Sequence, residues 1–175
     1  MLPSIVLIPV LAALVVAALP ARHARNAALI GTGIAALLSL ALLTPGGLQA
    51  DGFSWVVLRP WFPAYGASFH LGVDSVSGVL IVLTGFLAFV AAAMPAKVAD
   101  GRERGYFAAI LVAMSATNGA FASLDLITFY VFFEACLIPI FLMIGAYGSG
   151  DRSRATLKFL VYTVAGSLLM LAGIL

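Results

Sequence analysis

The sequence predicts an all-α protein, a polytopic bundle of six transmembrane helices. Of its 175 residues, 63% are hydrophobic and 9% are charged, whereas soluble domains carry about 25% charged residues. Its apolar segments are each close to the roughly 20 residues that cross a hydrocarbon core of about 30 Å. Because lipid offers the backbone no hydrogen-bond partners, only helices and closed barrels span it. Barrel strands would be short and alternating, so the segments are expected to be helices.

Six such segments follow one another along the chain. They are expected at Leu2–Leu19, Ala27–Leu43, Val76–Met94, Tyr106–Leu124, Leu126–Tyr147 and Thr156–Leu175. The first also has the length of a secretory signal, but such a signal carries its positive charges ahead of the apolar run. Here Arg22 and Arg25 come after the run, and no Lys or Arg precedes it. The first segment is therefore interpreted as a retained transmembrane helix.

The nine Lys and Arg residues indicate how the bundle is oriented in the membrane. Eight of them fall on one side, in the connections after the first, third and fifth helices: Arg22, Arg25, Lys97, Arg102, Arg104, Arg152, Arg154 and Lys158. Only Arg59 falls on the other side, in the loop after the second helix. Cytoplasmic connections are enriched in Lys and Arg. The side with eight cations is therefore expected to face the cytoplasm, with the N-terminus outside.

One connection, Thr44–Ser75, is long and is predicted to lie on the outer side. It is rich in aromatic residues, which favour the membrane–water interface: Trp55, Trp61, Phe62, Tyr65 and Phe69. From Phe69 to Ser77 we expect a short extended segment that leads into a helix cap. Asp74 or Ser75 would accept hydrogen bonds from the first free N–H groups of the third helix. Structural packing is the expected role of this loop.

Glu134 is the strongest candidate for a functional residue. It is the lone carboxylate in the apolar run from Leu126 to Tyr147. It lies eight residues after Leu126, about 12 Å along the helix axis and near the middle of the hydrocarbon core. An ionisable group at that depth costs at least about 2.5 kcal/mol, and such groups commonly serve ion passage or proton relay. The alternative is a carboxylate buried against another helix or another subunit for structural reasons.

Two residues near Glu134 shape its helix. Pro139 has no N–H to donate to the carbonyl of Ala135, which predicts a kink. The freed carbonyl either binds a polar partner or only affects packing. Asp125 directly precedes the helix and is expected to cap its first N–H groups, where a negative charge also suits the helix dipole.

Other polar side chains in the apolar segments are weaker candidates. Lys158 lies near the cytoplasmic start of the sixth helix, where its ammonium either snorkels to the interface or turns inward to face the fifth helix. Hydroxyl and amide groups on the fourth and sixth helices are typical of interhelical hydrogen bonds. Together they could instead line a hydrated path: Ser115, Thr117, Asn118, Tyr162, Thr163 and Ser167.

The composition excludes several kinds of site. Cys136 is the only cysteine, so neither an intrachain disulfide nor a cysteine-based zinc or iron–sulfur site can form. The two isolated histidines, His23 and His70, do not make a metal site. The sequence contains no Gly-rich phosphate loop and no haem-attachment motif, and its net charge of +2 does not suggest nucleic-acid binding.

Three stretches of the sequence resemble a known family. The first is Gly119–Pro139, which contains the run Phe-Phe-Glu-x-x-Leu-Ile-Pro around Glu134. The second is Arg154–Met170, and the third is the earlier run His70–Ser77. All three resemble subunit M of the proton-pumping NADH–quinone oxidoreductase, respiratory complex I. The resemblance begins near Phe69 and continues to the last residue.

The resemblance implies a fold and a role for two residues. Family members are antiporter-like subunits with fourteen helices, so this chain would be an N-terminal fragment of that fold. Residues 1–120 would form an N-terminal membrane region, and residues 121–175 would begin the proton-translocating domain. Glu134 matches the proton-relay glutamate of the family's fifth helix, and Lys158 matches a position with a suggested role in proton uptake or pairing. The lysine thought to control Glu134 would lie beyond Leu175.

The resemblance also implies partners and a location. The chain would be a subunit of NADH:quinone oxidoreductase, a proton translocase in which quinone reduction elsewhere drives proton movement. It would hold no cofactor, since other subunits handle NADH, FMN, the iron–sulfur clusters and quinone, and the fragment alone would be inactive. Its partners would be other membrane-arm subunits and the lipid of a bacterial plasma membrane. A subunit of a multisubunit cation/proton antiporter is the alternative, because both groups share the fold and the buried glutamate.

Overall fold

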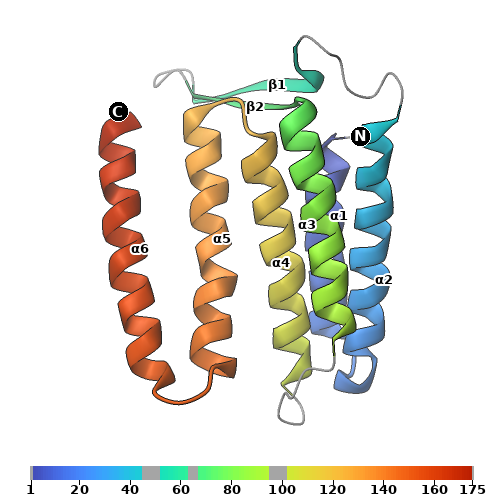
Figure 1. Cartoon of the computed structure of the whole chain (residues 1–175), viewed down its shortest axis with the longest axis vertical. Coiled ribbons are helices and arrows are strands. Elements are labelled where there is room, and N and C mark those ends of the chain that lie inside the picture. Colours follow the sequence, from blue (N-terminus) through green and yellow to red (C-terminus); the bar gives the residue numbers. More distant parts are fainter. Residues whose placement is uncertain (1, 45–51, 63–66, 95–101, 175) are drawn as a thin grey trace.

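The computed structural model describes residues 2–44, 52–62, 67–94 and 102–174. The elements are α1 (Leu2–Ala18), α2 (Ala21–Leu40), a 3-10 helix η1 (Ala41–Leu43), β1 (Ser54–Phe62), β2 (Ala67–Val73), α3 (Ser75–Ala93), α4 (Glu103–Ala122), α5 (Leu126–Tyr147) and α6 (Arg152–Ile174). The helices stand side by side, and the two strands lie across one end of them (Figure 1). The predicted bundle of apolar helices is confirmed, with a β-hairpin in addition.

Five of the described helices are long and apolar enough to cross a membrane, with 19 to 23 residues each. α1 is a shorter apolar helix of 17 residues, about 25 Å long and at the lower limit for spanning. α5 begins and ends where the sequence predicted, whereas α2 begins at Ala21 rather than Ala27. The polar residues at its start lower the hydropathy but do not interrupt the backbone hydrogen bonds, so the helix extends beyond the apolar segment.

The helices alternate in direction, so their connections gather at two ends. The hairpin end carries β1 and β2, including Arg59 (Figure 1). The arginine-rich end is defined by the cations at the starts of α2, α4 and α6: Arg22, Arg25, Arg102, Arg104, Arg152 and Arg154. Lys97 lies outside the described residues. This segregation agrees with the charge pattern of the sequence, from which the positive-inside rule predicts a cytoplasmic position for the arginine-rich end.

β1 and β2 form an antiparallel hairpin where the sequence predicted only a short extended segment. Opposite residues include Arg59 with Phe69 and Val57 with Leu71. The hairpin is joined to the turn between α4 and α5, because the N–H of Leu124 donates to the carbonyl of His70 at 2.9 Å. Residues Pro63 to Gly66, between the strands, lie outside the described residues.

The predicted cap of α3 is confirmed. Asp74 Oδ1 accepts from the N–H of Ser77 at 2.7 Å, and Ser77 Oγ accepts from the N–H of Asp74 at 2.9 Å. This reciprocal capping box satisfies two backbone donors that the helix itself leaves free. The hydrogen bonds from the Ser77 backbone and side chain also hold the pKa of Asp74 below its usual value.

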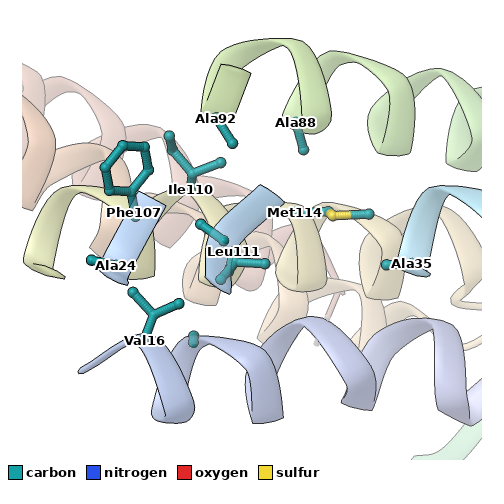
Figure 2. Packing of buried hydrophobic residues seen from close by; sticks show 11 residues of the cluster. Val16, Ala24, Ala35, Ala88, Ala92, Phe107, Ile110, Leu111 and Met114 are labelled. Carbon is teal, nitrogen blue, oxygen red and sulfur yellow. The ribbon is translucent and has the colours of Figure 1, made fainter. Parts of the chain in front are cut away.

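α1 to α4 pack into a four-helix bundle with a core of small and large side chains. Ala24 and Ala35 of α2 and Ala88 and Ala92 of α3 lie around larger side chains of α4, including Leu111 (Figure 2). Small residues let helix backbones approach closely in a membrane. α4 is the most buried helix, with 56% of its apolar window inside the structure.

α5 and α6 extend the bundle as an open pair. α5 packs against α4, and α6 stands at the outer edge against α5 (Figure 1). Only 11% of the α5 window and 6% of the α6 window are buried. The pair therefore presents a broad apolar surface, and Glu134 belongs to it.

Candidate functional site

Asp125 determines where α5 begins. Its Oδ1 accepts hydrogen bonds from the backbone N–H groups of Ile127 and Thr128, both at 3.0 Å. The predicted cap is thus confirmed. Burial raises the pKa of Asp125, but hydrogen bonds from Thr128, Ser68 and Ile127 outweigh it, so this pKa lies below its usual value. A charged carboxylate at this position also interacts favourably with the helix dipole.

The second oxygen of Asp125 connects α5 to the hairpin. Asp125 Oδ2 accepts from the N–H of Ser68 at 3.3 Å. In return, Thr128 Oγ1 donates to the carbonyl of Ser68 at 2.8 Å. These contacts position the start of α5 against β2. Sequence reasoning missed them, because they join residues 57 and 60 positions apart with no local pattern.

The rotation of α5 about its axis is set by α4. A Cβ atom at Gly119 would lie 2.3 Å from the ring of Phe132, so only glycine admits this ring. One turn further along α5, Cys136 Sγ lies 3.3 Å from Thr117 Oγ1. Residues four apart share one helix face. Glu134 is two residues from both Phe132 and Cys136, so it lies on the opposite face, away from the four-helix bundle.

Glu134 lines a groove of about 270 Å³ between α5 and α6. Aliphatic and aromatic side chains form most of the lining: Leu137, Ile138, Phe141, Leu142, Phe159, Leu160, Thr163 and Val164. The only hydroxyl among them, Thr163 Oγ1, already donates to the carbonyl of Phe159 at 2.7 Å. The groove thus surrounds one carboxyl group with apolar walls.

The carboxyl group of Glu134 lacks a partner in the described part of the chain. Its Oε1 is buried and accepts no hydrogen bond there. A buried polar atom without a partner costs about 1–3 kcal/mol. A hydrogen-bond donor or a cation that reaches this oxygen would remove that cost. Within the same residues, no group of His, Cys, Asp and Glu could hold a metal ion.

Lys158 is not brought to Glu134. Gly145 of α5 and Thr156 of α6 lie beside each other, since a Cβ at Gly145 would be 3.3 Å from Thr156 Oγ1. Because the two helices are antiparallel, we count eleven residues back along α5 from Gly145 and eleven forward along α6 from Thr156. This count places Glu134 level with Ser167. Lys158 is nine residues from Ser167, about 13 Å along the axis. Its side chain is exposed, and the ion pair that the described residues form is Arg154 with Asp151, at 3.3 Å.

The other predicted polar residues lie in separate places. Ser115 donates to the carbonyl of Val6 at 2.6 Å, and Asn118 is fully buried. Both therefore belong to the four-helix bundle. On α6, Thr163 lines the groove while Tyr162 is 77% exposed. The structure does not gather these residues on one path.

Pro139 lies within α5, which continues through it from Leu126 to Tyr147. Its side chain is buried. Because proline has no N–H, the carbonyl of Ala135 receives no hydrogen bond from it. This carbonyl follows Glu134 directly in the chain.

The chain is similar to one family of membrane proteins. A family model described as "NADH:quinone oxidoreductase/Mrp antiporter, TM" matches residues 123–175. NADH-quinone oxidoreductase subunit M of Rhodobacter capsulatus is 40% identical over 87% of this chain and 29% of that protein. NADH-ubiquinone oxidoreductase chain 4 of Arabidopsis thaliana is 34% identical over 99% of this chain and 36% of that protein. The chain thus spans about a third of the length of these relatives.

Solved structures show the same fold. A chain of respiratory complex I from Thermus thermophilus with bound NADH matches with a TM-score of 0.84 and 33% identity, over 98% of this chain and 34% of that chain. A chain of the Mrp complex from Dietzia sp. DQ12-45-1b matches with a TM-score of 0.81 over 98% of this chain and 18% of that chain. At 19% identity the second match concerns the fold alone.

Proposed function

We propose that the chain belongs to the NADH:quinone oxidoreductase/Mrp antiporter family of membrane subunits and that it works in the membrane arm of an NADH:quinone oxidoreductase. In this role it moves protons while quinone is reduced elsewhere in the complex. The identities of 30–40% to subunit M and chain 4 proteins support this assignment. The family match over residues 123–175 supports a proton-translocating domain that begins near residue 121.

Glu134 carries the proposal. Its Oε1 is buried without a hydrogen-bond partner in the described residues, about 12 Å into α5 and inside an apolar groove. A relay needs a group whose proton affinity changes when a partner arrives or leaves. Glu134 has an open groove on the side where such a partner would approach. Lys158, exposed nearer the arginine-rich end, would then assist proton uptake from the cytoplasm rather than pair directly with Glu134.

The proposed complex supplies what this chain is expected to lack. NADH, FMN, iron–sulfur clusters and quinone would be held by other subunits, and this chain would contribute no redox centre. Its partners would be neighbouring membrane-arm subunits, in a bacterial plasma membrane. A cation/proton antiporter subunit remains the alternative, because the matching family description names the Mrp antiporter as well. Genes for flavin and iron–sulfur subunits next to the gene for this chain would favour the oxidoreductase over the antiporter.

The test is Glu134→Gln in the full-length subunit within its assembled complex. Proton uptake by inverted membrane vesicles is measured with NADH as donor, next to NADH oxidation by an artificial acceptor. We expect proton uptake to fall at least about tenfold, which corresponds to 1.4 kcal/mol or more, while reduction of the artificial acceptor is unchanged. Glu103→Gln is the matched control, because Glu103 also has a buried carboxyl oxygen without a partner in the described residues but lies at the start of α4.

Two results would contradict the proposal. Unchanged proton uptake in an assembled Glu134→Gln complex would exclude Glu134 as a relay. Loss of assembly in this variant, with normal assembly of Glu103→Gln, would assign Glu134 a structural role instead. Blue native electrophoresis of the membranes distinguishes these results.

A further inference from the structure

A second groove lies between α1 and α2, on the far side of the bundle from Glu134. It has a volume of about 420 Å³. Apolar side chains and one glycine line it: Ile8, Leu11, Ala12, Val15, Ala27, Ile30, Gly31 and Ile34. None of these residues contributes to the groove beside Glu134, so the two grooves are independent of each other.

The floor of this groove is made by small residues where α1 and α2 cross. A Cβ atom at Gly31 would lie 2.6 Å from the Cβ of Ala12, so the backbones approach closely at this point. The walls are large apolar side chains that project outward, with Leu11 58% and Ile30 63% exposed. A narrow floor between long apolar walls fits a hydrocarbon chain.

The start of α2, with Arg22 and His23, continues from the groove towards the arginine-rich end and is called its mouth. His23, Ala27, Ile30 and Ile34 follow one another at intervals of four, three and four residues, so they share one face of α2. His23 thus extends the α2 wall of the groove towards the cytoplasm. Beside it, the Nε–H of Arg22 donates to His23 Nε2 at 3.0 Å.

This hydrogen bond leaves several donors free to bind an anion. Because Nε2 of His23 accepts, Nδ1 is the ring nitrogen left to donate. The terminal amino groups of Arg22 remain available as well, and Arg22 forms no ion pair within the described residues. A guanidinium with free N–H groups recognises a phosphate by charge-assisted hydrogen bonds. Arg25 differs, because its guanidinium already donates to the carbonyl of Ala93.

We propose that this groove binds an anionic phospholipid of the cytoplasmic leaflet. The phosphate accepts hydrogen bonds from Arg22 and His23, and one acyl chain lies along Leu11, Val15 and Ile30. The charge of the mouth and the apolar lining are complementary to the two parts of such a lipid. Basic pockets between transmembrane helices on the cytoplasmic side are a recurrent form of lipid recognition.

The experiment uses the full-length subunit in its native complex, reconstituted into nanodiscs. The probe is phosphatidylglycerol with a photoactivatable group on its acyl chain, and cross-linked peptides are identified by mass spectrometry. We expect labelling of α1 and α2 around Leu11 and Ile30. Arg22→Gln combined with His23→Gln should reduce this labelling about tenfold, and Ile30→Trp should reduce it by filling the groove.

Three controls distinguish a specific lipid site from general attraction to the cationic surface. Arg25→Gln removes the same charge one turn away and should reduce labelling less than the Arg22 and His23 changes. Labelled phosphatidylcholine, which has a phosphate but no net charge, should label the groove less than phosphatidylglycerol. Millimolar inorganic phosphate should not displace the lipid, since it gains nothing from the apolar groove.

Three outcomes would overturn the proposal. Equal losses of lipid labelling in the Arg25→Gln variant and in the combined Arg22 and His23 variant would mean that the lipid is attracted non-specifically to the cationic surface. Displacement of the lipid by inorganic phosphate would mean an anion site without an acyl-chain groove. Lipid labelling of neighbouring subunits with none on α1 or α2 would mean that a protein partner covers the groove. Blue native electrophoresis confirms that each variant complex is assembled.

Discussion

The four-helix bundle of α1 to α4 and the open pair of α5 and α6 are both made of apolar helices, but they bury them to different extents. In the bundle, small residues bring the helices together and bury 56% of the α4 window. In the pair, large apolar residues face outward and 6% of the α6 window is buried. Lipid tolerates such an apolar surface. Burial of apolar side chains therefore does not point to a functional site, and the site proposed at Glu134 is distinguished by its polar group.

Asn118 and Glu134, two polar residues that lie at the same level of the helices, make this comparison more specific. Gly119 contacts Phe132 and Thr117 contacts Cys136 across the α4–α5 interface, so Asn118 lies level with Glu134. Both have buried side-chain atoms without partners in the described residues. Asn118 is four residues from both Met114 and Ala122, and shares their face inside the bundle. The bundle thus holds a neutral amide, and the pair holds an ionisable carboxyl next to a groove.

The largest effect is expected when the amide inside the bundle is given a charge. Asn118→Asp should destabilise the subunit by about 3 kcal/mol or more, because a buried charge without a partner is costly. Asn118→Leu should be neutral or stabilising, since it removes unpaired polar atoms and keeps a similar shape. Thermal unfolding of the full-length subunit in nanodiscs measures both. Similar stabilities for the two variants would show that water or a partner reaches Asn118.

A smaller but still large effect is expected at the boundary between the two regions. Gly119→Leu should cost about 1–3 kcal/mol or more, because its side chain would collide with Phe132 and push α5 away from α4. Gly166→Leu on α6 is the control, since no atom lies within 4 Å of a Cβ at that position. Its expected change is within about 0.5 kcal/mol. If Gly166→Leu proves equally harmful in the assembled complex, the outer face of α6 is covered by another helix or subunit.

The cap that joins the pair to the hairpin should contribute less. Asp125→Ala should cost about 1–2 kcal/mol, the usual range for a lost N-cap, in thermal unfolding at neutral pH. The pKa of Asp125 is lowered in the folded protein, so its stabilisation is present above the unfolded value of about 3.9. It is lost as the pH falls through the folded pKa. The Asp125→Asn variant should therefore lose less stability than the wild type when the pH is lowered from 5 towards the folded pKa, and identical pH profiles would contradict this role.

The smallest effect is expected from the contact between Thr117 and Cys136. Thr117→Val keeps the shape of the side chain but removes the hydroxyl that lies 3.3 Å from Cys136 Sγ. The expected loss of stability is below about 1 kcal/mol. Proton uptake by the assembled complex should stay unchanged, because Gly119 and Phe132 still set the rotation of α5. A marked loss of proton uptake without loss of assembly would show that this hydroxyl belongs to the proton path.

Local features of the sequence were enough to predict the helices and the ends of α5, although α2 begins six residues earlier than predicted. The bounds of α5, the caps at Asp74 and Asp125, and the gathering of cations at one end all agree with the structure. Hydropathy, capping and charge act over a few neighbouring residues, so they can be recognised in a sequence without knowledge of its folding. The depth of Glu134 in α5 follows from the same local geometry.

The tertiary structure alone decided which way these groups face and what they meet. The sequence predicted that Glu134 lies within a membrane span, but only the contact of Gly119 with Phe132 turns it away from the bundle. The hairpin that Asp125 joins to α5, and the roughly 13 Å between the levels of Lys158 and Glu134, likewise depend on contacts between distant residues. The reason is physical: helix formation depends on neighbouring residues, whereas helix rotation and register depend on close packing between helices.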